Sequence, residues 1–348
     1  MALTDSISAT STATRGSGFR IGALCLLLIL VILPRFDRNT LFVDQPHRDD
    51  VQYRRYVEFF RGGPENGLES ASTWRPLVPF LAAFLPARPM TAINLVNTFA
   101  LLGTLVFLLL ILRRSGVDPA GEWLGGLLFV LSFPAFYYST IGYVDPGGLF
   151  FIAMGTWLTI RKKWTAALCC AIVGVLAKES AFVLVAVLSA GAWARGRSRK
   201  QVVLLSVTCL LALVVVSAAV REMAPGVRYA SIWIPSVDAF ADNAARPRAW
   251  LSGALTVGIP GLILLVNAIR RKLPTEPATL LPLFWAGLTA SVAMWLFAFT
   301  SAYVDGRTLW PSVMFSIPLA VLSIKPRSSR EGHGSIPVPD QPSVGGMS

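Results

Sequence analysis

The chain is divided into long apolar stretches, and short clusters of Arg and Lys lie between them. The apolar stretches cover residues 21–33, 91–112, 121–141, 144–160, 164–177, 180–194, 201–220, 250–269, 279–301 and 307–324. A helix needs about 20 predominantly apolar residues to cross a bilayer. The sequence therefore predicts an all-α polytopic membrane protein with about ten transmembrane helices.

The composition points to the same class of protein. Hydrophobic residues make up 54% of the chain, charged residues make up 14%, and the mean hydropathy is +0.60. The net charge of +12 comes from short clusters between apolar stretches, so we expect membrane topology rather than nucleic-acid binding to explain it. All four cysteines lie within apolar stretches without metal-type spacing, which is typical of small buried hydrophobic residues.

The basic clusters predict the orientation, because cytoplasmic loops of membrane proteins are enriched in Arg and Lys. The clusters lie at residues 113–114, 161–163, 195–200, 270–272 and 325–330. Ten spans with a cytoplasmic amino terminus place all five clusters, and both termini, in the cytoplasm. Residues 19–325 then form one transmembrane domain, and the polar segments 1–18 and 326–348 are predicted to be disordered cytoplasmic tails.

The first external loop is predicted to run from residue 35 to residue 89. Within it, residues 74–86 are apolar enough to suggest a further span, but a crossing there would move Arg113-Arg114 to the outer face. We therefore expect a re-entrant or interfacial helix with Pro76 in its first turn, where the missing N–H costs nothing.

The earlier part of the same loop has the pattern of an amphipathic helix. Tyr53, Tyr56, Val57 and Phe60 recur at helical spacing within residues 49–60. This pattern predicts a helix that lies on the membrane surface.

A charged pair, Lys178-Glu179, interrupts the apolar stretch from Trp164 to Trp193. An ionisable side chain at the centre of a transmembrane helix costs roughly 2.5–3.5 kcal/mol. The stretch is long enough for two short spans, which would place the pair at a hairpin tip on the outer face. The pair is either a neutralised hairpin tip or part of a functional site.

The predicted topology gathers further charged residues on the outer face. They are Asp37, Asp44, Asp49 and Asp50 in the first loop, Asp145 at the start of a span, and Asp305 and Arg307 in a later turn. Carboxylates can act as general bases, and Lys and Arg can hold phosphate. A single outward-facing site explains why acidic and paired charges lie opposite the basic clusters.

Each of these residues also has a simpler structural interpretation. Asp49 or Asp50 could cap the surface helix, with Asp50 pairing to Arg54 one turn later. Asp145-Pro146 is a common helix start, and Asp305-Gly306-Arg307 is compatible with an ordinary solvated turn.

The motifs and their order resemble a known family. They are Asp50-x-x-Tyr53-x-x-Tyr56, Trp74-Arg75-Pro76-Leu77-x-Pro79, Tyr143-x-Asp145, Leu176-Ala177-Lys178-Glu179, and Arg307 with Pro311. Over residues 20 to 325 this arrangement resembles the GT-C superfamily of integral-membrane glycosyltransferases. The similarity is greatest to bacterial members that use polyprenyl-phosphate sugars.

The resemblance implies an inverting transfer from a polyprenyl-phosphate sugar to a glycan, lipid or protein acceptor. The reaction would take place on the external, periplasmic face of the bacterial inner (plasma) membrane. It assigns the general base to Asp50, with Asp49 and Asp44 as rivals. The implied phosphate ligands are Lys178, Arg307 and Arg75, and the implied substrate-binding residues are Glu179, Asp145, Tyr53, Tyr143 and Asp305.

The sequence contains no His, Cys and carboxylate cluster with metal-ligand spacing, and His47 and His333 are its only histidines. We therefore expect no metal site or assured cofactor, although a divalent cation between first-loop Asp residues stays open. Two other functions also stay open. One is a transporter of a small polar or anionic solute, and the other is a non-catalytic scaffold of envelope assembly.

Overall fold

The computed structural model describes residues 3–36, 49–68, 70–226, 234–275, 277, 279–301 and 304–324. Within these ranges the chain forms helices and no strand, which confirms the all-α prediction. Six helical segments are long and apolar enough to cross a membrane. They are Ser17–Arg35, Pro89–Arg114, Arg199–Met223, Pro247–Ile269, Leu281–Ser301 and Gly306–Ile324. The chain is therefore a membrane protein by its helices, but the expected count of about ten spans is not confirmed.

The α-helices are α1 (Leu3–Ile32), α2 (Asp49–Phe60), α3 (Ser70–Thr73), α4 (Leu77–Ala83), α5 (Pro89–Arg114), α6 (Pro119–Val130), α7 (Phe133–Tyr137), α8 (Asp145–Ile160), α9 (Trp164–Ala177), α10 (Val183–Trp193), α11 (Arg199–Met223), α12 (Val237–Ala244), α13 (Pro247–Ile269), α14 (Leu281–Ser301) and α15 (Val313–Ile324). The 3₁₀ helices are η1 (Leu33–Arg35), η2 (Glu179–Phe182) and η3 (Gly306–Ser312).

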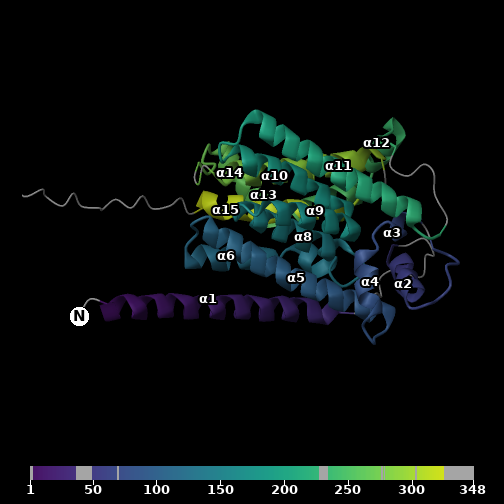
Figure 1. Ribbon diagram of the computed structural model, residues 1–348, viewed down its shortest axis with the longest axis horizontal. Helices are drawn as coiled ribbons and strands as arrows, with labels where there is room; N and C mark the ends of the chain where they lie inside the picture. The colour runs from purple at the N-terminus through teal and green to yellow at the C-terminus, as the bar shows by residue number, and fades with distance from the viewer. Residues whose placement is uncertain are drawn as a thin grey trace, which may run out of the picture.

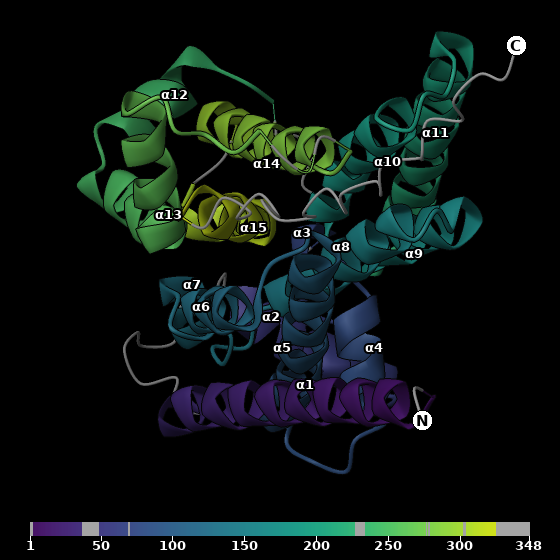
Figure 2. The same cartoon turned by 90° about the vertical axis from the view of Figure 1, so that its left-hand side faces the viewer.

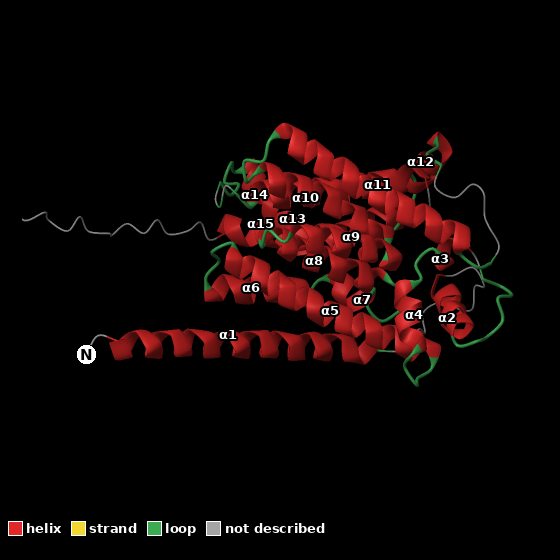
Figure 3. Cartoon of the chain, in the orientation of Figure 1, coloured by secondary structure: helices red, strands yellow, loops and turns green. Residues whose placement is uncertain are grey.

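In the view of Figure 1 the long helices run across the picture, and the short helices α2, α3, α4 and α12 lie at the same end of the molecule. We call this the α2 end. From the side, α12 to α15 form one group, α8 to α11 form a second, and α1, α5 and α6 lie together below them (Figure 2). Figure 3 shows that loops join helices at both ends of this bundle.

The structure corrects the predicted span over residues 121–141. This segment forms two short helices, α6 and α7, because Ser132 caps α7 through a hydrogen bond from the Ala135 N–H and Pro134 supplies no N–H of its own. Helix α6 has 12 residues, about 18 Å, whereas the hydrocarbon core of a bilayer is about 30 Å thick.

Two further segments differ from the sequence-based expectation. Helix α1 begins at Leu3, whereas residues 1–18 were expected to be disordered. Extending a helix costs far less than nucleating one, so a polar segment can continue the helical path of an adjoining apolar span. Helix α13 is broken at Gly258, which has a positive φ of 53°, and Pro260 follows two residues later. The tail from residue 326 lies outside the described residues.

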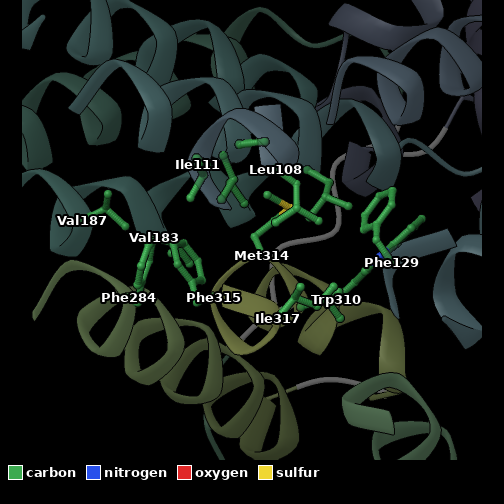
Figure 4. Packing of buried hydrophobic residues seen from close by; sticks show 14 of the residues in the cluster. Leu108, Ile111, Phe129, Val183, Val187, Phe284, Trp310, Met314, Phe315 and Ile317 are labelled. Carbon is green, nitrogen blue, oxygen red and sulfur yellow. The ribbon is translucent and has the colours of Figure 1, made fainter. Parts of the chain in front are cut away.

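The hydrophobic core is built around α15, whose residues from Val313 to Leu322 are all buried. Figure 4 shows Met314, Phe315 and Ile317 of this helix among side chains of α5, α6, α10 and α14. Leu108 and Phe129 belong to the same cluster. Interdigitated apolar side chains provide the packing attraction between membrane helices, because lipid supplies no hydrophobic driving force between them.

An ion-pair group ties α1 to α5 and α6 at the end opposite α2. Buried Glu122 accepts hydrogen bonds from Arg20, at 3.2 Å, and from Arg113, at 3.0 and 3.1 Å. Charge-assisted bonds of this kind are strong, and removal of one buried partner leaves the others incompletely paired.

We expect Glu122→Gln to destabilise the protein by about 2 kcal/mol, because Arg20 and Arg113 would lose a shared counter-charge in a partly exposed setting. The apparent thermal midpoint in detergent should fall by roughly 5 °C. Glu58→Gln is the matched control, because exposed Glu58 lies on α2 and makes no ion pair within the described chain. Equal midpoints for the two variants would contradict this role of Glu122.

Candidate functional site at the α2 end

Helix α2 covers the residues that the sequence predicted, from Asp49 to Phe60. Its apolar face buries Tyr53 and Val57, and the helix packs on α4 and α5. Arg61 follows α2 and donates hydrogen bonds to the carbonyl oxygens of Ala82, Ala83 and Leu85. These bonds satisfy carbonyl groups at the carboxyl end of α4 and hold α2 and α4 together.

Helix α4 has seven residues, about 10 Å, and is therefore too short to cross a bilayer by itself. Arg75 lies immediately before Pro76, the N-cap residue of α4, and its side chain points back to α2. Its guanidinium donates to the Tyr53 hydroxyl at 2.6 Å and to Glu179 Oε2 at 2.8 Å. Arg75 thus joins the first loop to the turn after α9.

Lys178 lies between α9 and η2, as the hairpin prediction required, and its backbone is extended. Its ammonium forms an ion pair with Asp145, the first residue of α8, and both side chains are buried. Burial lowers the pKa of Lys178, and the positive charges of Arg75 and Arg307 lower it further. A Cβ atom at Gly148 would lie 2.8 Å from the Lys178 Cβ, so α8 must carry glycine there for the pair to form.

Arg307 lies at the centre of the site, and we call its guanidinium the hub. Its guanidinium lies 3.0 Å from Asp49, 3.2 Å from Asp305 and 3.9 Å from Asp145. It also lies 3.8 Å from the centre of the Tyr143 ring, which is cation–π geometry. Asp305 caps η3 by accepting a hydrogen bond from the Arg307 backbone N–H. Asp305 therefore forms the predicted turn and also contacts the Arg307 guanidinium.

The two adjacent first-loop aspartates have different surroundings. The Asp49 side chain is 34% exposed and pairs with Arg307, whereas Asp50 is 1% exposed and lies 3.6 Å from Arg54. Burial by itself raises the pKa of Asp49, but the charges of Arg307 and Arg75 outweigh that effect and the pKa is lowered. Asp49 therefore remains ionised and accessible. The third candidate, Asp44, lies outside the described residues.

The charges of this site balance closely. Every cation has a carboxylate partner: Arg54 has Asp50, Arg75 has Glu179, Lys178 has Asp145, and Arg307 has Asp49 and Asp305. The site therefore holds one more carboxylate than cations. Asp49 is more exposed than Asp305, so it is the carboxylate that an incoming anion would replace most easily on Arg307.

Two asparagines that the sequence analysis missed position the loop before α8. Asn94 donates to the Thr140 carbonyl and accepts from the Gly142 N–H, at 3.1 and 3.3 Å. Asn97 donates to the Tyr143 carbonyl at 2.5 Å. These bonds fix Tyr143 beside Arg307. The sequence signal for this role is a pair of amide side chains three residues apart on one face of an apolar helix, and both are buried in the structure.

A third missed asparagine supports the segment that carries Asp305 and Arg307. Asn243 of α12 donates to the Phe299 carbonyl at 2.9 Å and accepts from the Val304 N–H at 3.3 Å. Ser252 of α13 accepts from the Gly306 N–H at 2.9 Å. Helix α12 lies in a polar connection for which the sequence analysis predicted no helix.

The described residues contain no group of three or more His, Cys, Asp or Glu side chains that could hold a metal ion. The Arg307 guanidinium occupies the centre between Asp49, Asp145 and Asp305, where a cation shared by these carboxylates would have to lie.

Comparison with protein-family models, with curated proteins and with solved structures found no match for this chain.

Proposed function

We propose that the protein is an integral-membrane glycosyltransferase that moves a sugar from a polyprenyl-phosphate carrier to an envelope acceptor, with inversion. The observation that carries this proposal is the meeting of Asp49, Asp145, Asp305 and Lys178 around Arg307, at the ends of membrane helices. A polyprenyl carrier keeps its chain in lipid and its phosphate at the interface. Catalytic groups for such a donor belong at helix ends and on interfacial helices.

In the proposed reaction, Arg307 and Lys178 receive the donor phosphate. As the acceptor oxygen bonds to the anomeric carbon, the bond from that carbon to the phosphate oxygen breaks, and polyprenyl phosphate leaves with the electron pair. The base takes the proton of the acceptor hydroxyl. Donors aimed at the leaving phosphate stabilise the developing charge, by roughly 3 kcal/mol for each donor in a dehydrated site. Arg75 is a further phosphate ligand, with Tyr53 and Glu179 as its partners.

We assign the base to Asp49 rather than to Asp50, the residue that the sequence favoured. A base must approach the acceptor hydroxyl to about 3 Å or reach it through one water. Asp49 is partly exposed, whereas Asp50 is buried and paired with Arg54. When phosphate replaces Asp49 on Arg307, the carboxylate loses its strongest counter-charge and its pKa rises toward its ordinary range. Donor binding thus prepares the base.

The proposed enzyme lies in the bacterial inner membrane, with both termini in the cytoplasm and the α2 end outside. We expect Asn66→Cys and Asp238→Cys, in a background without the native cysteines, to react with an impermeant maleimide in intact spheroplasts. Lys200→Cys should react only after the membrane is opened. The opposite pattern would place the candidate site in the cytoplasm and contradict a periplasmic transfer.

The direct test of the proposed function is turnover. The purified chain is incubated with labelled polyprenyl-phosphate sugars and envelope acceptors, and the glycosylated product and released polyprenyl phosphate are measured. Product of inverted anomeric configuration supports the proposal. Absence of transfer with every carrier-linked sugar would refute it.

A transporter is the second candidate, because two features of the chain are common in transporters. One is the buried pair of Lys178 and Asp145, and the other is the break in α13 at Gly258. Uptake of a labelled anionic solute into proteoliposomes, without consumption of a lipid-linked sugar, would favour this function over transfer.

A further inference from the structure

Six basic side chains gather at the end of the molecule opposite α2. We call Arg114, Arg161, Lys162, Lys163, Arg195 and Arg197 the basic cluster. Arg195 donates a hydrogen bond of 3.1 Å to the Ile160 carbonyl, which joins the loop after α10 to the end of α8. The guanidiniums of Arg195 and Arg197 lie 5.7 and 4.6 Å from the centre of the Trp164 ring.

Among the described residues, no carboxylate forms an ion pair with this cluster. The sequence has no Asp or Glu between Asp145 and Glu179, or between Glu179 and Glu222. Within the described chain, none of the six side chains forms an ion pair, and the nearby Glu122 already pairs with Arg20 and Arg113. Burial lowers the pKa of Arg195, and the positive charge of Arg114 lowers it further. The candidate site at the α2 end differs, because each of its cations has a carboxylate partner.

One member of the cluster, Lys162, has an unfavourable backbone conformation. Helices α8 and α10 both end in a left-handed residue, with the next N–H bonded five residues back. Helix α10 uses Gly196 for this position, whereas α8 uses Lys162 with a φ of 60°. Glycine fits a left-handed residue without strain, so Lys162 carries a strain that Gly196 avoids, as does Arg271 after α13 with a φ of 54°.

The cluster lies at the level of the membrane surface. The apolar span of α5 ends at Arg114, and the span of α11 begins at Arg199, two residues after Arg197. Trp164 lies within the cluster, and Trp193 is an exposed residue at the end of α10. Tryptophan rings are enriched at the depth of lipid headgroups. Beside the cluster, α11 leaves Leu204, Val207 and Leu211 exposed.

We propose that the basic cluster binds the phosphate headgroup of an anionic phospholipid, whose acyl chains lie along the exposed face of α11. Unneutralised Arg and Lys side chains between helix ends, next to a tryptophan and an apolar surface, complement both parts of such a lipid. This site is separate from the candidate catalytic site, so it does not depend on glycosyl transfer.

The test uses the full chain in a neutral detergent, titrated with phosphatidylglycerol or phosphatidylcholine, with bound lipid counted by native mass spectrometry. We expect saturable binding of phosphatidylglycerol, at least tenfold tighter than that of phosphatidylcholine. The triple variant Arg161→Gln, Lys163→Gln, Arg197→Gln should bind about a hundredfold more weakly, at about fivefold for each cation lost. The matched control, Arg270→Gln, Arg271→Gln, Lys272→Gln, removes the same charge beside α13 and should bind like the wild type.

Equal affinity of the wild type for the two lipids would overturn the proposal. Equal weakening by the control variant would also overturn it, because overall charge rather than a site would then attract the lipid. If the triple variant does not fold, the single variant Arg197→Gln replaces it, since that guanidinium contacts the Trp164 ring without a side-chain hydrogen bond in the described chain. Arg197→Gln should weaken phosphatidylglycerol binding about fivefold. Unchanged binding would contradict the proposed lipid site.

Discussion

Replacement of Asp49 by asparagine is expected to lower the rate of glycosyl transfer by a hundredfold or more, the usual scale for loss of a general base. The amide keeps the shape of the side chain but cannot take the proton of the acceptor hydroxyl. The same variant should bind polyprenyl phosphate about fivefold more tightly, because a partly exposed ion pair worth about 1 kcal/mol no longer competes for Arg307. Single-turnover rates and equilibrium binding of the carrier phosphate measure the two effects separately.

Asparagine variants at Asp50, Asp44 and Asp145 are the controls for this result. Asp50→Asn should reduce the rate less than Asp49→Asn, because the Asp50 side chain is buried and pairs with Arg54. If Asp49→Asn is active and Asp50→Asn is inactive, the base is Asp50, the residue that the sequence favoured. If all four variants transfer at the wild-type rate, the carboxylate mechanism is wrong.

Lys178→Ala should reduce transfer by roughly a hundredfold or more, because the leaving phosphate loses one of its cations. Lys178→Arg should keep part of the activity, since the charge survives while its geometry changes. Loss of the ammonium also leaves Asp145 without its closest partner, which can cost several kcal/mol in a buried setting. A loss of activity in Lys178→Ala alone would therefore not separate catalysis from stability.

The double variant Lys178→Met with Asp145→Asn separates them. Replacement of both members of a buried ion pair removes the unpaired charge, so folding and thermal stability should recover. Transfer should remain low, because the phosphate ligand is still missing. Wild-type transfer by the double variant would show that the pair has only a structural role.

Several elements could be read from the sequence because they depend on local pattern. The spacing of Tyr53, Tyr56 and Val57 predicts α2 with its observed bounds, since helical periodicity alone brings apolar side chains onto one face. The turn at Lys178 follows from the cost of placing a charge inside an apolar span. The division of residues 121–141 into α6 and α7 was missed, because hydropathy does not detect the cap that Ser132 provides.

The sequence by itself determined the membrane class, the helical fold and the residue types that collect outside the apolar spans, because these follow from composition and period. The tertiary structure alone decided the partners. Asp49 and Arg307 are 258 residues apart, so no local pattern could indicate that they meet, or that Asp49 rather than Asp50 faces the hub. Adjacent side chains point in different directions around a helix, so α2 exposes the Asp49 carboxylate and buries that of Asp50. The packing of α2 on α4 and α5 sets this orientation.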